Sequence, residues 1–167
     1  MNTAPEKNLA LMHTAYKTLQ SGDLDACAAM LTENFIANVP GMPDPLHGRE
    51  VWKLGAQAML EAFPDLQIQV EDMFSVDDKV AVRVHFRGTH QGTFQGIRAT
   101  QRPVSFRSIE LYRLEGDKIA EEWVAPDMLS LMGQISAGGA GEAREEDALA
   151  PDQGVGEDDG SAHRAAN

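Results

Sequence analysis

Asp127 is the residue whose position in the sequence most suggests acid–base chemistry. It follows Trp123 by four residues, and Glu121, Trp123, Ala125 and Asp127 share one face if the strand stays extended through Pro126. Burial on an apolar face that bears a tryptophan disfavours the charged form of a carboxyl group, which makes it a stronger base. The same position also suits the N-cap of a helix expected from residue 128, because aspartate is a preferred capping residue. The two roles are compatible, and the residues alone leave both open.

His90 is the second candidate for chemistry. It has the same parity as the alternating apolar residues of the expected strand 80–86, so it should face the core or a pocket unless Gly88 hosts a bulge. A pocket histidine can orient a carbonyl group or shuttle a proton, and the alternative is a structural histidine that closes the strand end. His85 falls on the opposite face, where we expect solvent or a dimer surface rather than the site.

Metal-binding, phosphate-binding and nucleophile motifs do not accompany these two residues. His85 and His90 are expected on opposite faces, and the sequence has no His-x-His, His-x-x-x-His or cysteine pair. A glycine-rich phosphate loop follows none of the expected strands, and Gly-x-Ser-x-Gly is missing. We therefore expect no metal site, no phosphate-binding loop and no serine nucleophile of this type.

Aromatic and polar side chains supply candidates for substrate contact. By base rate such aromatic residues belong to the core, but Tyr16 and Trp52 carry a polar group that can point at a ligand, so we expect them in a pocket. Asn38 and His47 flank a proline-rich loop, either at the pocket mouth or as solvated loop residues. The candidate substrate-contacting residues are Trp123, Tyr16, Trp52, Phe35, Asn38, Met59 and Phe106.

Helices followed by strands must position these residues. Three- and four-residue apolar spacing predicts helices at 5–20 and 49–62, a shorter one capped by Asp23, and a last one at about 127–135. Alternation predicts a short strand at 35–39 and then four strands in a meander, at about 66–70, 80–86, 104–114 and 118–124. Three prolines predict an irregular loop at 40–48, and Arg107, Glu110 and Arg113 are expected to form cross-strand pairs. This order predicts an α+β fold with helices on one face of a curved sheet.

Composition limits the compartment and the partners. The net charge is −12 without a basic stripe, which argues against nucleic acid and against an anionic membrane as partner. No run of 18 apolar residues and no signal-peptide pattern is found, and the single Cys27 fits a reducing compartment, so we expect a cytoplasmic protein. Residues 137–167 carry 8 acidic residues, 2 arginines and few apolar ones, which predicts a disordered acidic tail after a domain of residues 1–136.

Four short segments appear in the order of a known family. They are Gly-Asp-Leu-Asp at 22–25, Phe-Pro-Asp-Leu at 63–66, Gly-Thr-His-Gln-Gly at 88–92, and Gly-Asp-Lys-Ile-Ala-Glu-Glu-Trp at 116–123, followed by Asp127, Leu131 and Gln134. Over residues 5–136 the chain resembles the SnoaL-like polyketide cyclase family of the NTF2-like superfamily. The resemblance implies a cone in which N-terminal helices pack on a strongly curved antiparallel sheet that encloses a pocket.

The resemblance also implies a reaction. Characterised cyclases of this family close a ring by an intramolecular aldol reaction on a small carbonyl-rich molecule, without metal or cofactor, and the residue that matches their aspartate is Asp127. The match of His90 implies a place in the pocket wall, and the family implies a homodimer. The segment 97–102 departs from the family pattern, so the resemblance does not determine the pocket rim or the substrate. Two alternatives stay open: another NTF2-like enzyme such as an isomerase or epoxide hydrolase, and a module that binds a hydrophobic ligand without catalysis.

Overall fold

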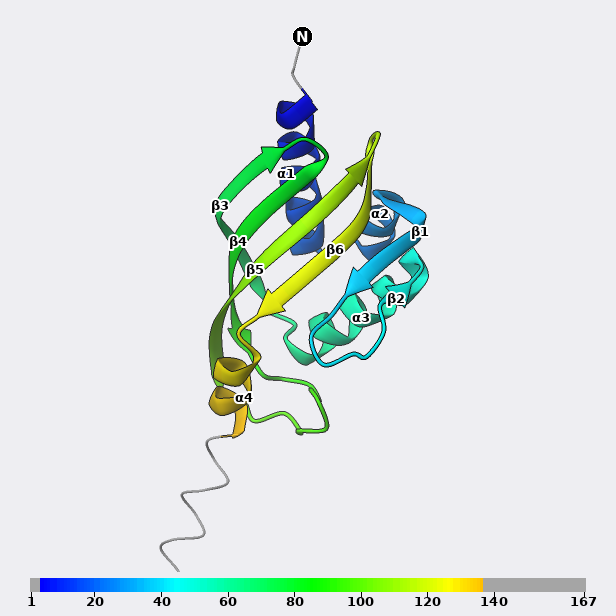
Figure 1. The fold of residues 1–167 in the computed structure, drawn as a ribbon. Helices are drawn as coiled ribbons and strands as arrows, with labels where there is room; N and C mark the ends of the chain where they lie inside the picture. Colours follow the sequence, from blue (N-terminus) through cyan, green and yellow to red (C-terminus); the bar gives the residue numbers. More distant parts are fainter. Residues whose placement is uncertain (1–3, 137–167) are drawn as a thin grey trace, which may run out of the picture. The chain divides into compact units, whose positions relative to one another are not determined.

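The computed structural model describes residues 4–136, and the expected acidic tail at 137–167 lies outside the described residues. Helices precede most of the strands, as the α+β prediction requires, and the sheet is curved and open (Figure 1). The elements are α1 (Ala4–Ser21), α2 (Leu24–Ala29), β1 (Leu31–Asn38), β2 (Leu46–His47), α3 (Arg49–Ala62), β3 (Gln67–Val76), β4 (Lys79–Thr89), β5 (Pro103–Glu115), β6 (Lys118–Pro126) and α4 (Met128–Ser136). None of the described helices is long and apolar enough to cross a membrane.

The sheet has the strand order β2-β1-β6-β5-β4-β3. Strands β3 to β6 form the predicted antiparallel meander, but β1 pairs with β6 in parallel, so the expected antiparallel sheet is in fact mixed (Figure 1). The reason is the long connection after β1. Helix α3 carries the chain from β1 to the opposite edge of the sheet, and the meander from β3 to β6 then leads the chain back to the side of β1. The predicted loop 40–48 also contains β2, which pairs with Ile36 and Ala37 directly after the last of its three prolines.

One face of the sheet, here called the inner face, packs against the helices and carries the core. Residues of β4 and β5 alternate along both strands, and their inner members are buried: Val80, Val82, Val84 and Phe86 on β4, and Val104, Phe106, Ser108, Glu110, Tyr112 and Leu114 on β5. Met12 and Tyr16 of α1 are buried in the same core. The opposite face, here called the outer face, carries the remaining residues of these strands, including Arg83, Arg107 and Ile109.

A bulge in β6 decides which of its side chains face inward. Leu114 pairs with Ile119, but Arg113 pairs with Glu121, so Ala120 is an extra residue in β6. Because of this insertion, Ile119 and Glu122 lie on the same face although their parities differ. Tyr112 pairs with Glu122, so Glu122 belongs to the inner face.

Candidate functional site

Asp127 lies on the surface and begins the last helix. The residue is exposed, its carboxylate Oδ1 accepts the backbone N–H of Ser130 at 2.9 Å, and its carbonyl accepts the N–H of Leu131. The capping alternative for Asp127 is therefore confirmed. Trp123 pairs with Leu111 on the outer face, so it does not line the cavity described below.

His90 is fully buried in a cluster of its own. Its ring stacks obliquely on Phe63 at 5.5 Å, and its Nδ1 atom accepts the backbone N–H of Thr100 at 3.3 Å. The Thr100 hydroxyl lies 3.0 Å from the same nitrogen. The other ring nitrogen, Nε2, has no hydrogen-bond partner among the described residues. His90 is not among the residues that line the cavity described next.

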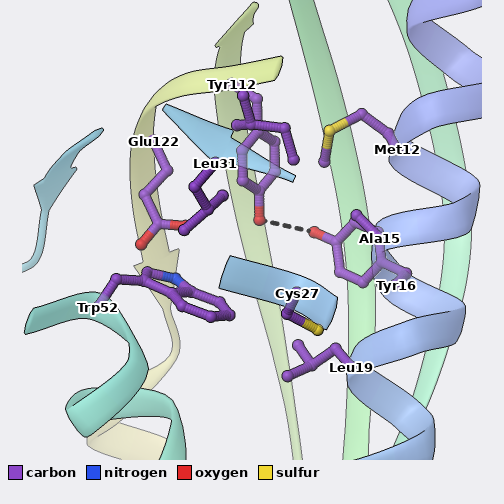
Figure 2. Close-up of a pocket in the computed structure, with 10 residues that line it drawn as sticks. Met12, Ala15, Tyr16, Leu19, Cys27, Leu31, Trp52, Tyr112 and Glu122 are labelled. Atoms are coloured by element: carbon purple, nitrogen blue, oxygen red, sulfur yellow. Dashed lines mark hydrogen bonds between the residues drawn. The ribbon is translucent and has the colours of Figure 1, made fainter. Parts of the chain in front are cut away.

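A cavity of about 40 Å³ lies between the inner sheet face and the first three helices (Figure 2). Its wall combines side chains from six elements, and it is mostly apolar with a few polar groups. The lining residues are Met12, Ala15, Tyr16 and Leu19 of α1, Cys27 of α2, Leu31 of β1, Trp52 of α3, Tyr112 of β5, and Ile119 and Glu122 of β6. Of the residues expected to touch a substrate, Tyr16 and Trp52 line this cavity.

The other expected contact residues lie elsewhere. Phe35 packs edge-on against Trp52 with ring centroids 6.5 Å apart, and Phe106 stacks on Phe86 at 5.1 Å. Met59 is half-buried against the core. The Asn38 side chain joins β1 to β6, where it donates to the Glu121 carboxylate and to the main-chain oxygen of Glu122. None of these four residues lines the cavity.

Glu122 is the acidic group of the cavity wall. Only 8% of the residue is exposed, and in Figure 2 its carboxyl group lies beside the Trp52 indole. Burial, and then the negative charge of Glu110, raise the pKa of Glu122 from 4.5 to about 8, against a smaller opposing effect of a hydrogen bond from the Trp52 side chain. A carboxyl group of this kind exchanges protons near neutral pH, which is the property required of a general acid or base.

Glu110 is bound by two tyrosine hydroxyl groups beside the cavity. Both the Tyr112 hydroxyl, at 2.6 Å, and the Tyr16 hydroxyl donate to the same oxygen, Oε2. The two hydroxyl oxygens lie 3.0 Å apart, the contact drawn in Figure 2. Burial, followed by the charge of Glu110, raises the pKa of both tyrosines, so both remain protonated donors at neutral pH. Tyr16, Glu110 and Tyr112 therefore form one buried acid–phenol group.

The alternation along β5 indicates that Glu110 faces inward, but the expected cross-strand pairs grouped it with two arginines. Arg107 does pair across the sheet with Glu71 at 3.1 Å, and Arg113 with Glu121 at 3.2 Å, both on the outer face. Glu110 differs from these arginines in parity, faces inward with Tyr112 and binds two tyrosines, so the cross-strand pair expected for it is wrong. Glu110 has the same parity as the buried residues of β5, so parity alone could have predicted that it faces inward. Glu122 was hidden because the aromatic Trp123 suggested the opposite face as the apolar one.

His85 lies on the outer face, as expected, but it is not solvated. It is 5% exposed, its Nε2 lies 2.7 Å from the Ser105 hydroxyl, and its Nδ1 lies 3.2 Å from the Arg87 guanidinium, which donates to it. Burial and the neighbouring arginines lower the pKa of His85, so it is neutral at pH 7. Within residues 4–136, no group of three or more acidic, histidine or cysteine side chains is placed to hold a metal ion.

Solved structures of similar fold come from several bacteria. A candidate SnoaL-like polyketide cyclase from Jannaschia sp. CCS1 has a TM-score of 0.76 and 22% identity, over 82% of this chain and 96% of the other. IdmH from Streptomyces antibioticus, a candidate polyketide cyclase, has a TM-score of 0.70 and 26% identity, over 77% of this chain and 98% of its own. AclR from Streptomyces galilaeus, a candidate hydroxylase, has a TM-score of 0.70 and 26% identity, over 78% and 81% of the two chains.

The family comparison agrees with the fold. No match was found among curated proteins. A family model described as SnoaL-like polyketide cyclase matches residues 10–135, which include every residue of the cavity wall. The chain therefore belongs to the SnoaL-like polyketide cyclase family.

Proposed function

We propose that this protein is a cofactor-independent acid–base enzyme that acts on a small carbonyl compound, with Glu122 as its catalytic residue. The observation that carries the proposal is a buried carboxyl group in the wall of an apolar cavity, where burial and the charge of Glu110 raise its pKa to about 8. Such a group is a stronger base than an ordinary glutamate, yet a useful fraction of it is ionised near neutral pH. Membership of a polyketide cyclase family supports an aldol-type ring closure as the reaction.

In the proposed reaction Glu122 moves one proton. Its ionised form removes a proton from a carbon atom between two carbonyl groups, and the electron pair of that C–H bond forms an enolate. The enolate carbon attacks a second carbonyl carbon of the same molecule, so that a C–C bond forms while the C=O π pair moves to oxygen. Glu122 then delivers its proton to that oxygen and returns to the ionised state. The carbonyl groups activate the carbon acid, so the protein supplies one base and a fixed orientation.

The cavity wall also limits the substrate. No lysine, arginine or histidine is among the residues that line it, and Glu110 adds a negative charge beside it. An anionic substrate would lose its hydration there without gaining a cationic partner, so the proposed substrate is uncharged. The cavity is also much smaller than the roughly 300–1,000 Å³ of most ligand sites. We infer that the substrate reaches Glu122 with one end only.

The pH dependence of proton exchange tests this function without knowledge of the natural substrate. Small neutral 1,3-dicarbonyl compounds would be incubated with the protein in D₂O, and loss of the carbon-bound proton would be followed by NMR. We expect enhanced exchange whose second-order rate constant rises with pH and levels off above about 8, as Glu122 ionises. Binding of these compounds without enhanced exchange at any pH would contradict catalysis and favour a ligand-binding module.

We also propose that the outer sheet face pairs with a second copy of the chain. Three large hydrophobic side chains are each more than half exposed on the outer face of β3 and β5: Phe74, Val76 and Ile109. Single exposed hydrophobic residues are ordinary on a protein surface, but a group of them marks an interaction site. Sedimentation is expected to give a dimer at roughly 10 µM, since interfaces of standard size hold at this concentration. Ile109→Glu should shift the protein to monomer, whereas the control Leu54→Glu, on an exposed position of α3, should not. A wild-type monomer would contradict the proposal.

A further inference from the structure

A second hollow lies where β3 begins and β4 ends, and it shares no residue with the cavity beside Glu122. Its volume is about 390 Å³, which falls within the roughly 300–1,000 Å³ of most small-ligand sites. It lies at the opposite end of the β3–β4 pair from the exposed Phe74, which pairs with Ala81. The residues that line this hollow are Gln20, Gln67, Ile68, Gln69, His85 and Arg87.

Arg87 brings an unpaired positive charge to the hollow. Arg83 and Arg107, on the same outer face, both bind the carboxylate of Glu71 at 3.1 Å, and Arg83 also binds Asp72. Within the part of the chain that the structure describes, Arg87 forms no ion pair with an acidic side chain. Three arginines and two carboxylates therefore leave one positive charge here, although the whole chain carries −12.

His85 holds the guanidinium group of Arg87 in one orientation. The Nη2 atom of Arg87 donates to Nδ1 of His85 at 3.2 Å, and because a guanidinium group cannot accept, Nδ1 carries no proton. The proton of the neutral ring then lies on Nε2, which donates to the Ser105 hydroxyl at 2.7 Å. Only 5% of His85 is exposed, so this chain of bonds is anchored in the sheet. After burial, the charges of two arginines lower the pKa of His85 and Glu71 raises it by less, so the local field is positive.

Two glutamine side chains beside Arg87 have unused amide groups. Gln67 pairs with Arg87 across the two strands and Gln69 pairs with His85, so both side chains lie next to the guanidinium group on the outer face. Neither amide has a hydrogen-bond partner among the described residues. The amide of Gln20, by contrast, already bonds to the main chain of the edge strand β3. The hollow therefore offers one guanidinium group and two amides to a ligand.

We propose that this hollow binds a small organic carboxylate with a single negative charge. The free nitrogens of the Arg87 guanidinium group match a carboxylate, which accepts parallel N–H bonds, and a guanidinium group that is already held in place loses less entropy on binding. One cation compensates one negative charge, so a doubly charged phosphate is a poorer fit. The two amides both donate and accept, so the ligand carries a hydroxyl or amide group beside its carboxylate. This site is independent of the proposed reaction, whose substrate is uncharged.

NMR of the full-length protein tests the site, because the Arg87 Nε–H group and the glutamine side-chain amides give signals of their own. Lactate and N-acetylglycine would be titrated at constant pH and ionic strength, with lactamide as a neutral control of the same shape as lactate. We expect shifts of the Arg87, Gln67 and Gln69 signals that saturate below roughly 10 mM carboxylate. Lactamide should give no saturable shift. Shifts that rise linearly with both carboxylates, or equal shifts with lactate and lactamide, would overturn the inference.

Arg87→Gln should raise the Kd of the carboxylate by about tenfold or more, because it removes the charge-assisted hydrogen bonds. Arg83→Gln is the matched control: this arginine lies on the same strand but already has acidic partners, so the saturable shifts should persist. Circular dichroism checks the fold, and the comparison of lactate with lactamide in the wild type decides if Arg87→Gln does not fold. Unchanged affinity in folded Arg87→Gln, or tighter binding of inorganic phosphate than of lactate, would overturn the inference.

The same variants separate this inference from the proposed reaction. Arg87→Gln should leave the proton exchange of dicarbonyl compounds unchanged, because Arg87 does not line the cavity. Glu122→Gln should leave the binding of lactate unchanged, because Glu122 does not line the hollow. Loss of proton exchange in folded Arg87→Gln would contradict a separate carboxylate site.

Discussion

Glu122→Gln is expected to lower catalysed proton exchange, and ring closure of a true substrate, by roughly 10²–10⁴-fold. Glutamine keeps the size of the side chain and can still accept a hydrogen bond from Trp52, but it cannot accept a proton from carbon. The NMR exchange assay in D₂O measures this effect directly. Substrate binding should change far less than the rate, because the cavity wall remains in place.

Asp127→Asn is the informative control for this experiment. Asparagine caps helices about as well as aspartate, so the bond to Ser130 and the fold should persist. Because Asp127 is exposed and does not line the cavity, we expect a nearly unchanged rate. If Asp127→Asn abolishes exchange while Glu122→Gln retains it, the base is Asp127, as the family resemblance implied, and the proposed role of Glu122 is wrong.

The free energy of unfolding of Glu122→Gln, relative to that of the wild type, should increase as pH rises. The folded pKa of Glu122 is about 8 and its ordinary value is 4.5, so the folded state holds its proton more tightly than the unfolded state. The associated stability is fully present below pH 4.5 and is lost as pH rises through about 8. Because glutamine does not titrate, the difference between the two proteins should grow by a few kcal/mol, to order of magnitude, across this window.

Urea unfolding at several pH values between 5 and 9 would measure this divergence. Glu121→Gln provides a matched control, because Glu121 is the adjacent residue of β6 but pairs with Arg113 on the outer face. Its difference from the wild type should vary far less across the range, because Glu121 does not line the cavity and lies beside the Arg113 guanidinium. A constant difference between Glu122→Gln and the wild type from pH 5 to 9 would show that the pKa of Glu122 is not raised.

Local patterns were sufficient for most elements of the fold. The spacing of Leu9, Met12, Tyr16 and Leu19 predicted α1, and Asp23 caps α2 through the N–H of Ala26 as expected. Alternation located β4 and β5 with boundary errors of one to three residues at each end. These features depend on residues close together in the chain, so the sequence contains the physical information needed to predict them.

The place of Glu122 in the candidate site required information that no local pattern holds. The sequence favoured Trp123 and Asp127 because a tryptophan suggests a buried face, yet the pairing with Leu111 puts Trp123 on the outer face. The extra residue Ala120 breaks the simple alternation of β6, and a bulge depends on how two strands pair. Parity within β6 therefore could not decide which of its acidic residues is buried.

The sequence by itself determined the α+β order, the family, the single cysteine and the acidic charge of this protein, and it identified Tyr16 and Trp52 as pocket residues. Only the tertiary structure decided that Tyr16, Glu110, Tyr112 and Glu122 converge, because α1, β5 and β6 meet through sheet pairing and core packing over about a hundred residues of chain. The raised pKa of Glu122 has the same origin. It results from burial and from a second carboxylate on a neighbouring strand, and both exist only when the chain is folded.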